Sequence, residues 1–275
     1  GVSGQAARQL AVGLGLDACL FDEGGQGDAS GFNLEALSGF DAFIFSPGFA
    51  AMHPWRVLAE DSGRPCYSEL GFAALHWRGR LLGVTGTNGK TTITSLLCHA
   101  LNSAGQTALE AGNMGTPLSN YVLSEANHAD ATAVCEISSF QAELPLELKL
   151  DGLIWSNFAE DHLDRYDSIT EYFTAKAKLL RCLSAGAPAV LGADVLAFDP
   201  SVVKLRGVIV VDEVSGLVDQ LGPSSSFRLH PQSTNFTLVT ALWEALELPA
   251  EALITSANAL QLAAHRLSPV TAWGG

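Results

Sequence analysis

A strand, a glycine-rich turn and a helix follow one another along the chain, and this unit constrains the fold more than any other feature. Leu81–Thr85 is a short apolar run that predicts a buried strand, and the turn reads Thr85-Gly86-Thr87-Asn88-Gly89-Lys90-Thr91. Residues 90–104 predict a helix, because their apolar positions form one stripe: Ile93, Leu96, Leu97, Ala100, Leu101 and Ala104. Gly105 fits the left-handed position after the helix end. Such a unit is typical of layered α/β proteins.

The turn is suited to holding the phosphates of a nucleoside triphosphate. Its glycines let backbone N–H groups converge on phosphate oxygens, and the helix N-terminus adds partial positive charge. Lys90 can reach the β- and γ-phosphates, and the Thr91 hydroxyl can bind Mg²⁺. The strict P-loop pattern has Gly where this chain has Val84, so the loop is a shortened variant. A purely structural glycine turn is the alternative, and the strand before it and the helix after it argue against that.

Composition excludes several classes of protein. Hydrophobic residues make up 48% of the 275 residues and charged residues 16%, so the chain can bury a core and is no disordered linker. Asp and Glu number 29 against 15 Lys and Arg, a net charge of −14, so nucleic acid is not an expected partner. No apolar run predicts a membrane span, and no signal peptide is recognisable. The five cysteines lack zinc-type spacing and predict reduced thiols.

The order of the predicted elements indicates two α/β domains. Residues 80–275 predict a larger P-loop domain with a mostly parallel sheet, with strands at 81–85, 132–137, 152–156, 187–191 and 207–211 and helices at 90–104, 170–184, 234–247 and 250–263. Residues 1–79 predict a smaller Rossmann-like domain, with helices over Gln5–Val12 and 54–61 and strands over Ala18–Phe21, Ala42–Phe45 and near Cys66. The first strand of this smaller domain is expected upstream of Gly1.

Two later segments carry side chains that suit a metal or a phosphate. Glu136 ends a predicted strand, where a carboxylate can bind a metal or a water. The run from Asp161 to Arg165 places His162 among carboxylates with a guanidinium close by. A solvated strand end and a mixed-charge surface loop explain the same residues, and the residues alone leave both readings open. Lys176 lies in a predicted helix, and nothing in the composition singles it out.

The turn, the segment Glu136–Gln141 and the run Asp161–Tyr166 together resemble the Mur ligases, ATP-dependent enzymes that form amide bonds in peptidoglycan assembly. Within that family, Ser138-Ser139-Phe140-Gln141 looks most like the member that adds D-glutamate to UDP-N-acetylmuramoyl-L-alanine. The resemblance implies that the acceptor carboxylate attacks the γ-phosphate of ATP, and that the amine of D-glutamate displaces phosphate from the acyl phosphate. It further implies a cytoplasmic bacterial enzyme, monomeric, with no nucleic acid or membrane partner.

The resemblance also implies roles for individual residues. ATP would be bound by the turn and its surroundings: Gly86, Thr87, Asn88, Gly89, Lys90, Thr91, Thr92, Asn235 and Arg266. Two Mg²⁺ ions would be held by Thr91, Glu136, His162 and Lys176, with Lys176 carbamylated so that it offers a carboxylate. Lys90, Glu136, His162 and Lys176 are the expected catalytic residues. The acceptor substrate would contact Val2, Ser3, Asp22, Ser46, Pro47, Gly48, Asn113, Ser138 and Arg165.

The chain departs from the family pattern in two places. The family's Gly-x-His-Asn-x-x-Asn run reads Leu229–Asn235 here, where only Asn235 fits cleanly and Gln232 stands in the place of the first Asn. The family also carries a third domain that holds the incoming amino acid, and we expect this sequence to be a fragment that lacks it and is inactive alone. The alternatives are another Mur-type ligase, a folylpolyglutamate synthase, or a non-catalytic module that binds a nucleotide or a UDP-sugar.

Overall fold

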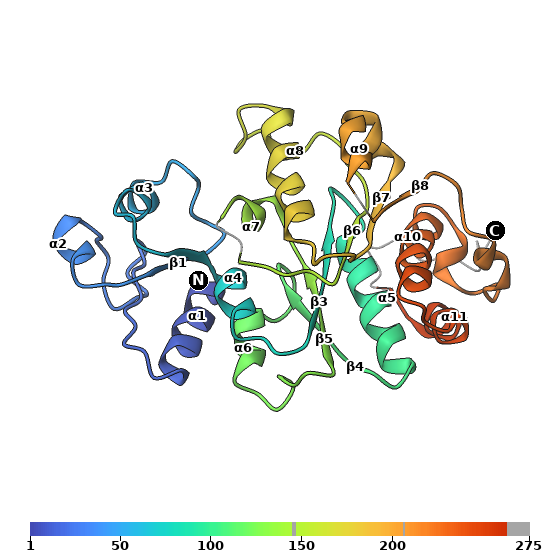
Figure 1. Ribbon diagram of the computed structural model, residues 1–275, viewed down its shortest axis with the longest axis horizontal. Helices are drawn as coiled ribbons and strands as arrows, with labels where there is room; N and C mark the ends of the chain where they lie inside the picture. The colour runs from blue at the N-terminus through green and yellow to red at the C-terminus, as the bar shows by residue number, and fades with distance from the viewer. Residues whose placement is uncertain (145–146, 206, 263–275) are drawn as a thin grey trace, which may run out of the picture.

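A six-stranded parallel sheet forms the centre of the molecule (Figure 1). The computed structural model describes residues 1–144, 147–205 and 207–262. The strands follow the order β4-β5-β3-β6-β7-β8 across the sheet. Their bounds are β3 (Arg80–Thr85), β4 (Thr107–Gly112), β5 (Ala131–Glu136), β6 (Gly152–Trp155), β7 (Ala189–Gly192) and β8 (Val208–Val211). The predicted α/β class with a parallel sheet is therefore confirmed.

Helices cover both faces of this sheet, which is why the residues of β3, β5, β6 and β7 are buried along nearly their whole length. Alternate residues serve opposite faces, so Leu81 joins one hydrophobic core while Leu82 and Val84 join the other. The core of Leu82 and Val84 is shared with α5 (Lys90–Ser103), α10 (Gln232–Ala245) and α11 (Ala250–Ala259). The core of Leu81 includes α6 (Leu118–Val122), α8 (Ile169–Ala177) and α9 (Ala193–Phe198).

The chain reverses its winding direction at β3. This strand pairs with β5 on one side and with β6 on the other, both in parallel. In open α/β sheets, ligands bind outside the carboxyl ends of the strands at such a reversal point. The turn after β3 and the loop after β6 therefore border the expected crevice.

The first 79 residues form a smaller layer at one end of the sheet (Figure 1). Strands β1 (Phe43–Phe45) and β2 (Cys66–Ser68) pair in parallel, and the helices are α1 (Val2–Gly13), α2 (Leu34–Leu37), α3 (Pro54–Asp61) and α4 (Glu69–Ala74). Leu10 of α1 and Leu70 of α4 enter the same hydrophobic core as Leu118 of α6. The layer is thus packed directly on the central unit, and the boundary near residue 79 stays a prediction.

The strand predicted over Ala18–Phe21 does not form. Asp28 N donates to Leu20 O at 2.7 Å, and Asp28 Oδ2 accepts from Leu20 N at 2.8 Å. Phe21 makes an isolated bridge with Ala29. The backbone of this segment is therefore bonded within its own loop, and the carboxylate of Asp28 takes the place of a partner strand.

Other differences concern an edge strand and two helix ends. Strand β4 was not predicted, because its Ala, Leu and Glu residues have little strand preference and pairing with β5 places it. Helix α8 ends at Ala177 and continues as the 3-10 turn η1 (Lys178–Cys182), and α11 ends at Ala259. The remaining elements are α7 (Ser139–Glu143), η2 (Pro200–Lys204), η3 (Gly216–Gln220) and η4 (Ser226–Arg228). Within the described ranges, none of the helices is both long and apolar enough for a bilayer crossing.

Candidate active site

The glycine turn lies between the carboxyl end of β3 and the N-terminus of α5, where the sequence predicts it. Gly86 and Gly89 have φ values of +148° and +83°, a backbone region that other residues rarely adopt. A β-carbon at Gly86 would collide with the Ser156 hydroxyl, and one at Gly89 would collide with the side chain of Asn235. Both glycines are therefore required by backbone conformation and by close packing.

Residues that follow β6 hold the turn in place. Asn157 exchanges two hydrogen bonds with the backbone of Asn88, accepting from N at 2.9 Å and donating to O at 3.1 Å. Ser156 Oγ donates to the same carbonyl at 2.6 Å. We did not single out Ser156 or Asn157 from the sequence. The signal was present, because both are polar residues directly after a buried strand that lies next to β3.

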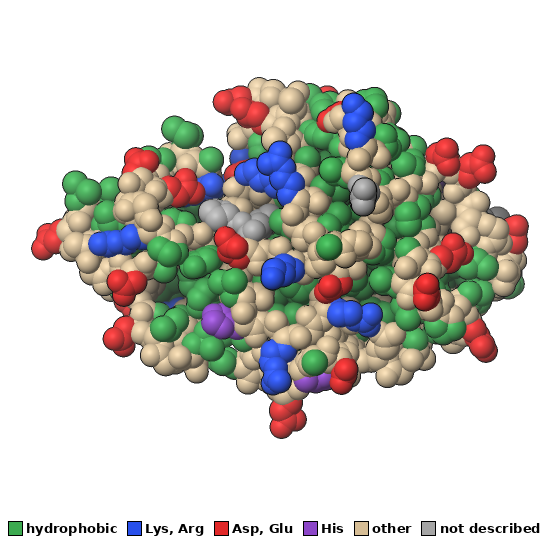
Figure 2. Space-filling view, viewed as in Figure 1, with side chains coloured by type: hydrophobic (Ala, Val, Ile, Leu, Met, Phe, Trp, Pro, Cys, Tyr) green, Lys and Arg blue, Asp and Glu red, His purple; other side chains and the backbone are tan. Residues whose placement is uncertain are grey.

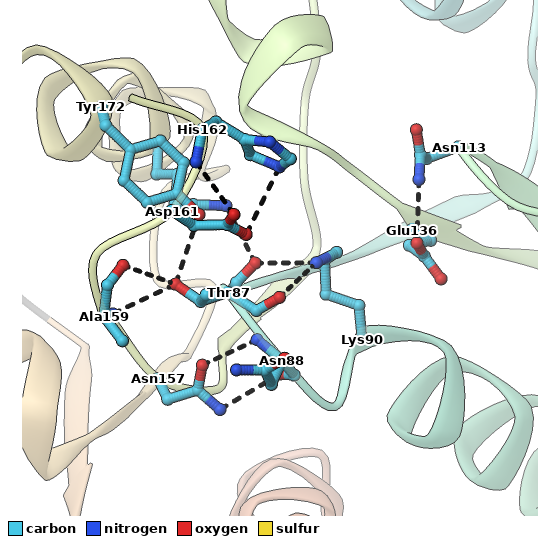
Figure 3. A network of polar contacts seen from close by, with 12 residues as sticks. Thr87, Asn88, Lys90, Asn113, Glu136, Asn157, Ala159, Asp161, His162 and Tyr172 are labelled. Atoms are coloured by element: carbon cyan, nitrogen blue, oxygen red, sulfur yellow. Dashed lines mark hydrogen bonds and ion pairs between the residues drawn. The ribbon is translucent and has the colours of Figure 1, made fainter. Parts of the chain in front are cut away.

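Lys90 lies in the centre of the site (Figure 3). Its Nζ donates to Gly86 O at 2.9 Å and to Thr87 O at 2.8 Å, so the side chain curls back over the turn. Thr87 is fixed from the other side, since its Oγ1 accepts from Ala159 N at 3.1 Å and lies 3.2 Å from Tyr172 OH. The turn thus carries a positive charge over a backbone that neighbouring loops fix.

Glu136 reaches the start of α5. Thr91 Oγ1 donates to Glu136 Oε2 at 2.7 Å, and Asn113 Nδ2 donates to Glu136 Oε1 at 3.0 Å. The Glu136 side chain is almost fully buried at the carboxyl end of β5. Gly112 has a φ of +101° and lies so close to Glu136 O that a side chain there would collide with it. The structure therefore brings together Thr91, Glu136 and Asn113, three of the predicted site residues.

Lys176 is 1% exposed and lies under the turn. Its Nζ donates to Gly86 O at 2.9 Å and lies 4.8 Å from the centre of the Tyr172 ring. Burial and, to a smaller extent, the nearby charge of Lys90 lower the pKa of Lys176 to about 7, while Asp161 and Glu136 oppose the change. A larger share of this amine is therefore uncharged at neutral pH than in an ordinary lysine, and the uncharged amine is a nucleophile.

His162 and Arg165 come from the loop after β6. His162 has a φ of +54°, and its Nε2 lies 3.4 Å from Asp161 Oδ2. In Figure 3, His162 and Asp161 lie on one side of Lys90, while Glu136 and Asn113 lie on the other. Arg165 Nη2 donates to Glu143 Oε2 at 3.1 Å and to Phe49 O at 3.4 Å, so it links this loop to the first layer.

The predicted residues of the first layer lie near one another. Gly1 N lies 3.3 Å from Asp22 Oδ2, which places Asp22 beside Val2 and Ser3 at the start of α1. A β-carbon at Gly4 would lie 3.2 Å from Ser46 Oγ, so the same helix start is next to Ser46. Ser46-Pro47-Gly48 forms a turn closed by a hydrogen bond from Phe49 N to Ser46 O at 3.1 Å.

Three predicted residues have mainly structural contacts. Ser138 caps α7 together with Gln141: Ser138 Oγ accepts from Gln141 N, and Gln141 Oε1 accepts from Ser138 N. Thr92 is 3% exposed and lies on the buried face of α5. Asn235 donates to Gln232 Oε1 at 2.9 Å and touches the turn at Gly89, so it lies at the phosphate end of the site. Arg266 falls outside the described residues.

The oxygen ligands of the site fit Mg²⁺. Thr91 Oγ1 and Glu136 Oε2 are hard oxygen donors that already lie side by side at 2.7 Å. The described part of the chain contains no group of three or more His, Cys, Asp or Glu residues that could bind an ion. A second ion beside His162 would therefore need a further ligand, and a carboxylate formed on Lys176 would be one.

A parallel sheet with a glycine turn at the N-terminus of α5 and an acid at the end of β5 defines a P-loop protein of the α/β class. Residues 84–253 match the family model described as the Mur ligase middle domain. Since this match covers more than half of the sequence, the chain belongs to the Mur ligase family. The resemblance inferred from the sequence is thereby confirmed.

Relatives with known names are similar to part of the chain. It is 35% identical over 145 residues to a UDP-N-acetylmuramoylalanine--D-glutamate ligase of Leptospira interrogans. The matched residues make up 53% of this chain and 30% of that protein. It is 33% identical over 209 residues to the protein of the same name from Leuconostoc mesenteroides, covering 70% of this chain and 46% of that protein. The chain therefore spans less than half the length of these relatives.

Two solved structures share the fold. A UDP-N-acetylmuramate:L-alanyl-gamma-D-glutamyl-meso-diaminopimelate ligase from Neisseria meningitides has a TM-score of 0.54 and 16% identity, covering 93% of this chain and 87% of that one. The second is a UDP-N-acetylmuramoylalanyl-D-glutamyl-2,6-diaminopimelate--D-alanyl-D-alanyl ligase from Acinetobacter baumannii, with a TM-score of 0.56 and 16% identity. The match covers 84% of this chain and 63% of that one. At these identities the likeness concerns the fold alone.

Proposed function

We propose that the full-length protein is an ATP-dependent amide ligase that adds D-glutamate to UDP-N-acetylmuramoyl-L-alanine in the bacterial cytoplasm. Members of the Mur ligase family are ATP-dependent amide ligases, and the relatives above carry the name of this activity. The observation that carries the proposal is the convergence of Lys90, Glu136 and Lys176 on one glycine turn at a helix N-terminus.

The reaction would join two anions, so neutralising charge is the main task of the site. Lys90 Nζ donates hydrogen bonds to the carbonyls of Gly86 and Thr87. When ATP binds, this ammonium would turn from those carbonyls to the β- and γ-phosphate oxygens. The backbone N–H groups at the start of α5 would bind the same phosphates.

Mg²⁺, when bound, would neutralise phosphate charge, and Thr91 with Glu136 would hold one ion. His162 and a carbamylated Lys176 would hold the second. The modification requires the uncharged amine: Lys176 Nζ forms a bond to the carbon of CO₂ and releases a proton, which leaves a carbamate anion. The lowered pKa of Lys176 supports this step, because it supplies uncharged amine at neutral pH.

The acceptor would lie between the first layer and the central sheet. Ser46, Pro47 and Gly48 form a turn beside the start of α1, where the UDP group would bind. Asn113 and Arg165 lie on the central unit and would contact the muramoyl part. The acceptor carboxylate would attack the γ-phosphate of ATP, which gives an acyl phosphate and releases ADP. The amine of D-glutamate would then attack the acyl carbon, form the amide bond and displace phosphate.

The test is a phosphate-release assay on the full-length protein with UDP-N-acetylmuramoyl-L-alanine and a panel of D- and L-amino acids. The proposal predicts phosphate release that depends on the acceptor and on D-glutamate. Turnover with a folate in place of the UDP-sugar would indicate a folylpolyglutamate synthase. Nucleotide binding without phosphate release for any acceptor would indicate a non-catalytic binding module.

A further inference from the structure

A pocket of about 360 Å³ lies outside the candidate active site, between α3, the end of α7 and η1. Three basic side chains line it, namely Arg56 of α3 and Lys178 and Arg181 of η1. Both Arg56 Nη2 and Lys178 Nζ donate to the backbone carbonyl of Glu143, at 3.3 Å and 3.2 Å, which draws the basic groups together. Figure 2 shows Lys and Arg side chains gathered on this face, at the position of α8.

The pocket is lined mainly by basic residues, although the chain as a whole is acidic. The sequence has 29 acidic and 15 basic residues, yet the pocket is lined by three basic side chains and one carboxylate, that of Glu143. That carboxylate is paired with Arg165, 3.1 Å away, on the side of the candidate active site. Glu60 pairs with Arg56 Nε at 2.7 Å, and Glu147 is close enough to add to the effect of burial, which raises the pKa of Cys182. Lys178 and Arg181 remain as two exposed cations at the rim.

A buried polar atom at this place lacks a partner. The Arg56 side chain is 7% exposed, and its Nη1 is buried without a hydrogen-bond partner. Buried polar groups are nearly always bonded, so the unsatisfied Arg56 Nη1 indicates that a polar partner belongs there.

The floor of the pocket is apolar. Leu144 and Leu148 line it and are 1% and 6% exposed. Basic groups at the rim and leucines below are suited to an anion attached to a short apolar chain, because the charge meets Lys178 and Arg181 while the apolar part covers the leucines.

We propose that this pocket is a binding site for a small organic anion, with a phosphate or carboxylate group held by Arg56, Lys178 and Arg181 and an apolar stem held by Leu144 and Leu148. The site is separate from the proposed ATP site but is joined to it by α7. This helix begins beside Ser138 and ends at Glu143, which lines the pocket and pairs with Arg165.

The test is calorimetric titration of the full-length protein carrying Lys90→Ala, which removes the proposed phosphate contact at the turn. The probes are n-butyl phosphate, butyrate and inorganic phosphate. The test variant adds Lys178→Gln and Arg181→Gln, two exposed positions whose change leaves the core intact. The matched control adds Arg78→Gln and Lys204→Gln, which remove the same charge at exposed positions elsewhere.

The proposal predicts saturable binding of butyl phosphate or butyrate to one site, with the tighter of the two naming the preferred head group. Inorganic phosphate should bind more weakly, because it has no apolar stem. The Lys178→Gln/Arg181→Gln change should weaken binding about tenfold or more, and the control should change it by less than about twofold. Equal weakening in both variants, or no saturable binding at millimolar concentration, would overturn the proposal. Because Lys90 is already replaced, this result is independent of the proposed ligase activity.

Discussion

At the scale of single residues, Lys176 has the least ordinary environment in the site. A lysine in a helix usually faces solvent, but this side chain is enclosed beneath the turn and bonded to Gly86 O. Its lowered pKa arises mainly from the loss of hydration, with Lys90 as a second cause. The stability of the fold and the chemistry of the site therefore both depend on the protonation of one amine.

Replacing Lys176 by Met should stabilise the fold near pH 6. The native pKa of about 7 lies below the ordinary value of 10.5, so the unfolded chain binds more protons between these pH values. Stability of the wild type should consequently rise between pH 7 and pH 10, and the advantage of Lys176→Met should shrink over that range from about 2–4 kcal/mol. Urea denaturation in CO₂-free buffer measures this. An advantage of Lys176→Met that does not shrink between pH 7 and pH 10 would contradict the assignment.

The proposed carbamate makes a separate prediction about activity. In the full-length enzyme, Lys176→Glu should retain more activity than Lys176→Ala, because glutamate supplies a carboxylate without modification. Wild-type activity should also fall in CO₂-depleted buffer and return with bicarbonate, whereas Lys176→Glu should not respond. Equal loss in the two variants, measured by phosphate release, would count against a carboxylate at this position.

Gly89 is predicted to tolerate no side chain. Its φ of +83° costs an L-residue about 1–2 kcal/mol, and a β-carbon would also push against the buried Asn235. Gly89→Ala should therefore weaken ATP binding about tenfold or more in a calorimetric titration. Gly105→Ala is the matched control, since Gly105 has a φ of +78° with nothing within 4 Å. The control should lose some stability and keep its affinity for ATP.

At the scale of elements, two loops together fix the conformation of the glycine turn. The segment after β3 supplies the backbone, and the segment after β6 fixes it through Ser156 and Asn157. The two strands are neighbours in the sheet, with Thr85 opposite Trp155. The loop after β6 also carries His162, so a shift of this loop would move the turn and the proposed metal ligand together.

Removing Asn157 should therefore loosen the turn. Asn157→Ala loses two hydrogen bonds to the backbone of Asn88, each worth about 1 kcal/mol, so ATP affinity should fall about tenfold. Asn33→Ala is a matched control, because it too loses two hydrogen bonds between the asparagine side chain and the backbone, here to the N–H groups of Glu35 and Ala36 at the start of α2. If both variants bind ATP as the wild type does, the loop after β6 has no part in shaping the turn.

Local spacing was enough to predict the turn, α5 and the acid at the end of β5, since each depends on neighbours in the sequence. The burial of Lys176 and the contacts of Asn157 depend on which strands are neighbours in the sheet, and spacing does not encode that. The strand expected over Ala18–Phe21 failed because Asp28 bonds to its backbone, a contact across a loop. Strand β4 was missed because its pairing partner, not its residues, makes it a strand.

At the scale of the whole molecule, a buried carboxyl group joins the first layer to the central unit. Glu69 of α4 is 2% exposed and accepts from Ser119 Oγ at 2.6 Å and from Ser119 N at 3.1 Å, at the start of α6. Burial raises the pKa of Glu69, and the two hydrogen bonds from Ser119 only partly offset this. The contact between the two parts therefore includes an acid whose protonated form is favoured more than in a solvent-exposed glutamate.

The contact between Glu69 and Ser119 should contribute less to the stability of the fold as pH rises. An acid with a raised native pKa contributes most stability below its ordinary pKa of 4.5, and the contribution is lost as pH rises through the native value. Glu69→Gln keeps an acceptor for Ser119 without a charge, so it should gain stability relative to the wild type between pH 5 and pH 8. Denaturation at both pH values measures the difference. A variant that loses stability relative to the wild type over this range would contradict the account.

The central claim is that the turn around Lys90 binds the phosphates of ATP, and calorimetric titration of the full-length protein with ATP and Mg²⁺ tests it most directly. Lys90→Ala should reduce the affinity about a hundredfold, because a charged contact to the phosphates is lost. The exposed control Lys204→Ala should bind as the wild type does. Equal affinity in Lys90→Ala and the wild type would contradict the claim.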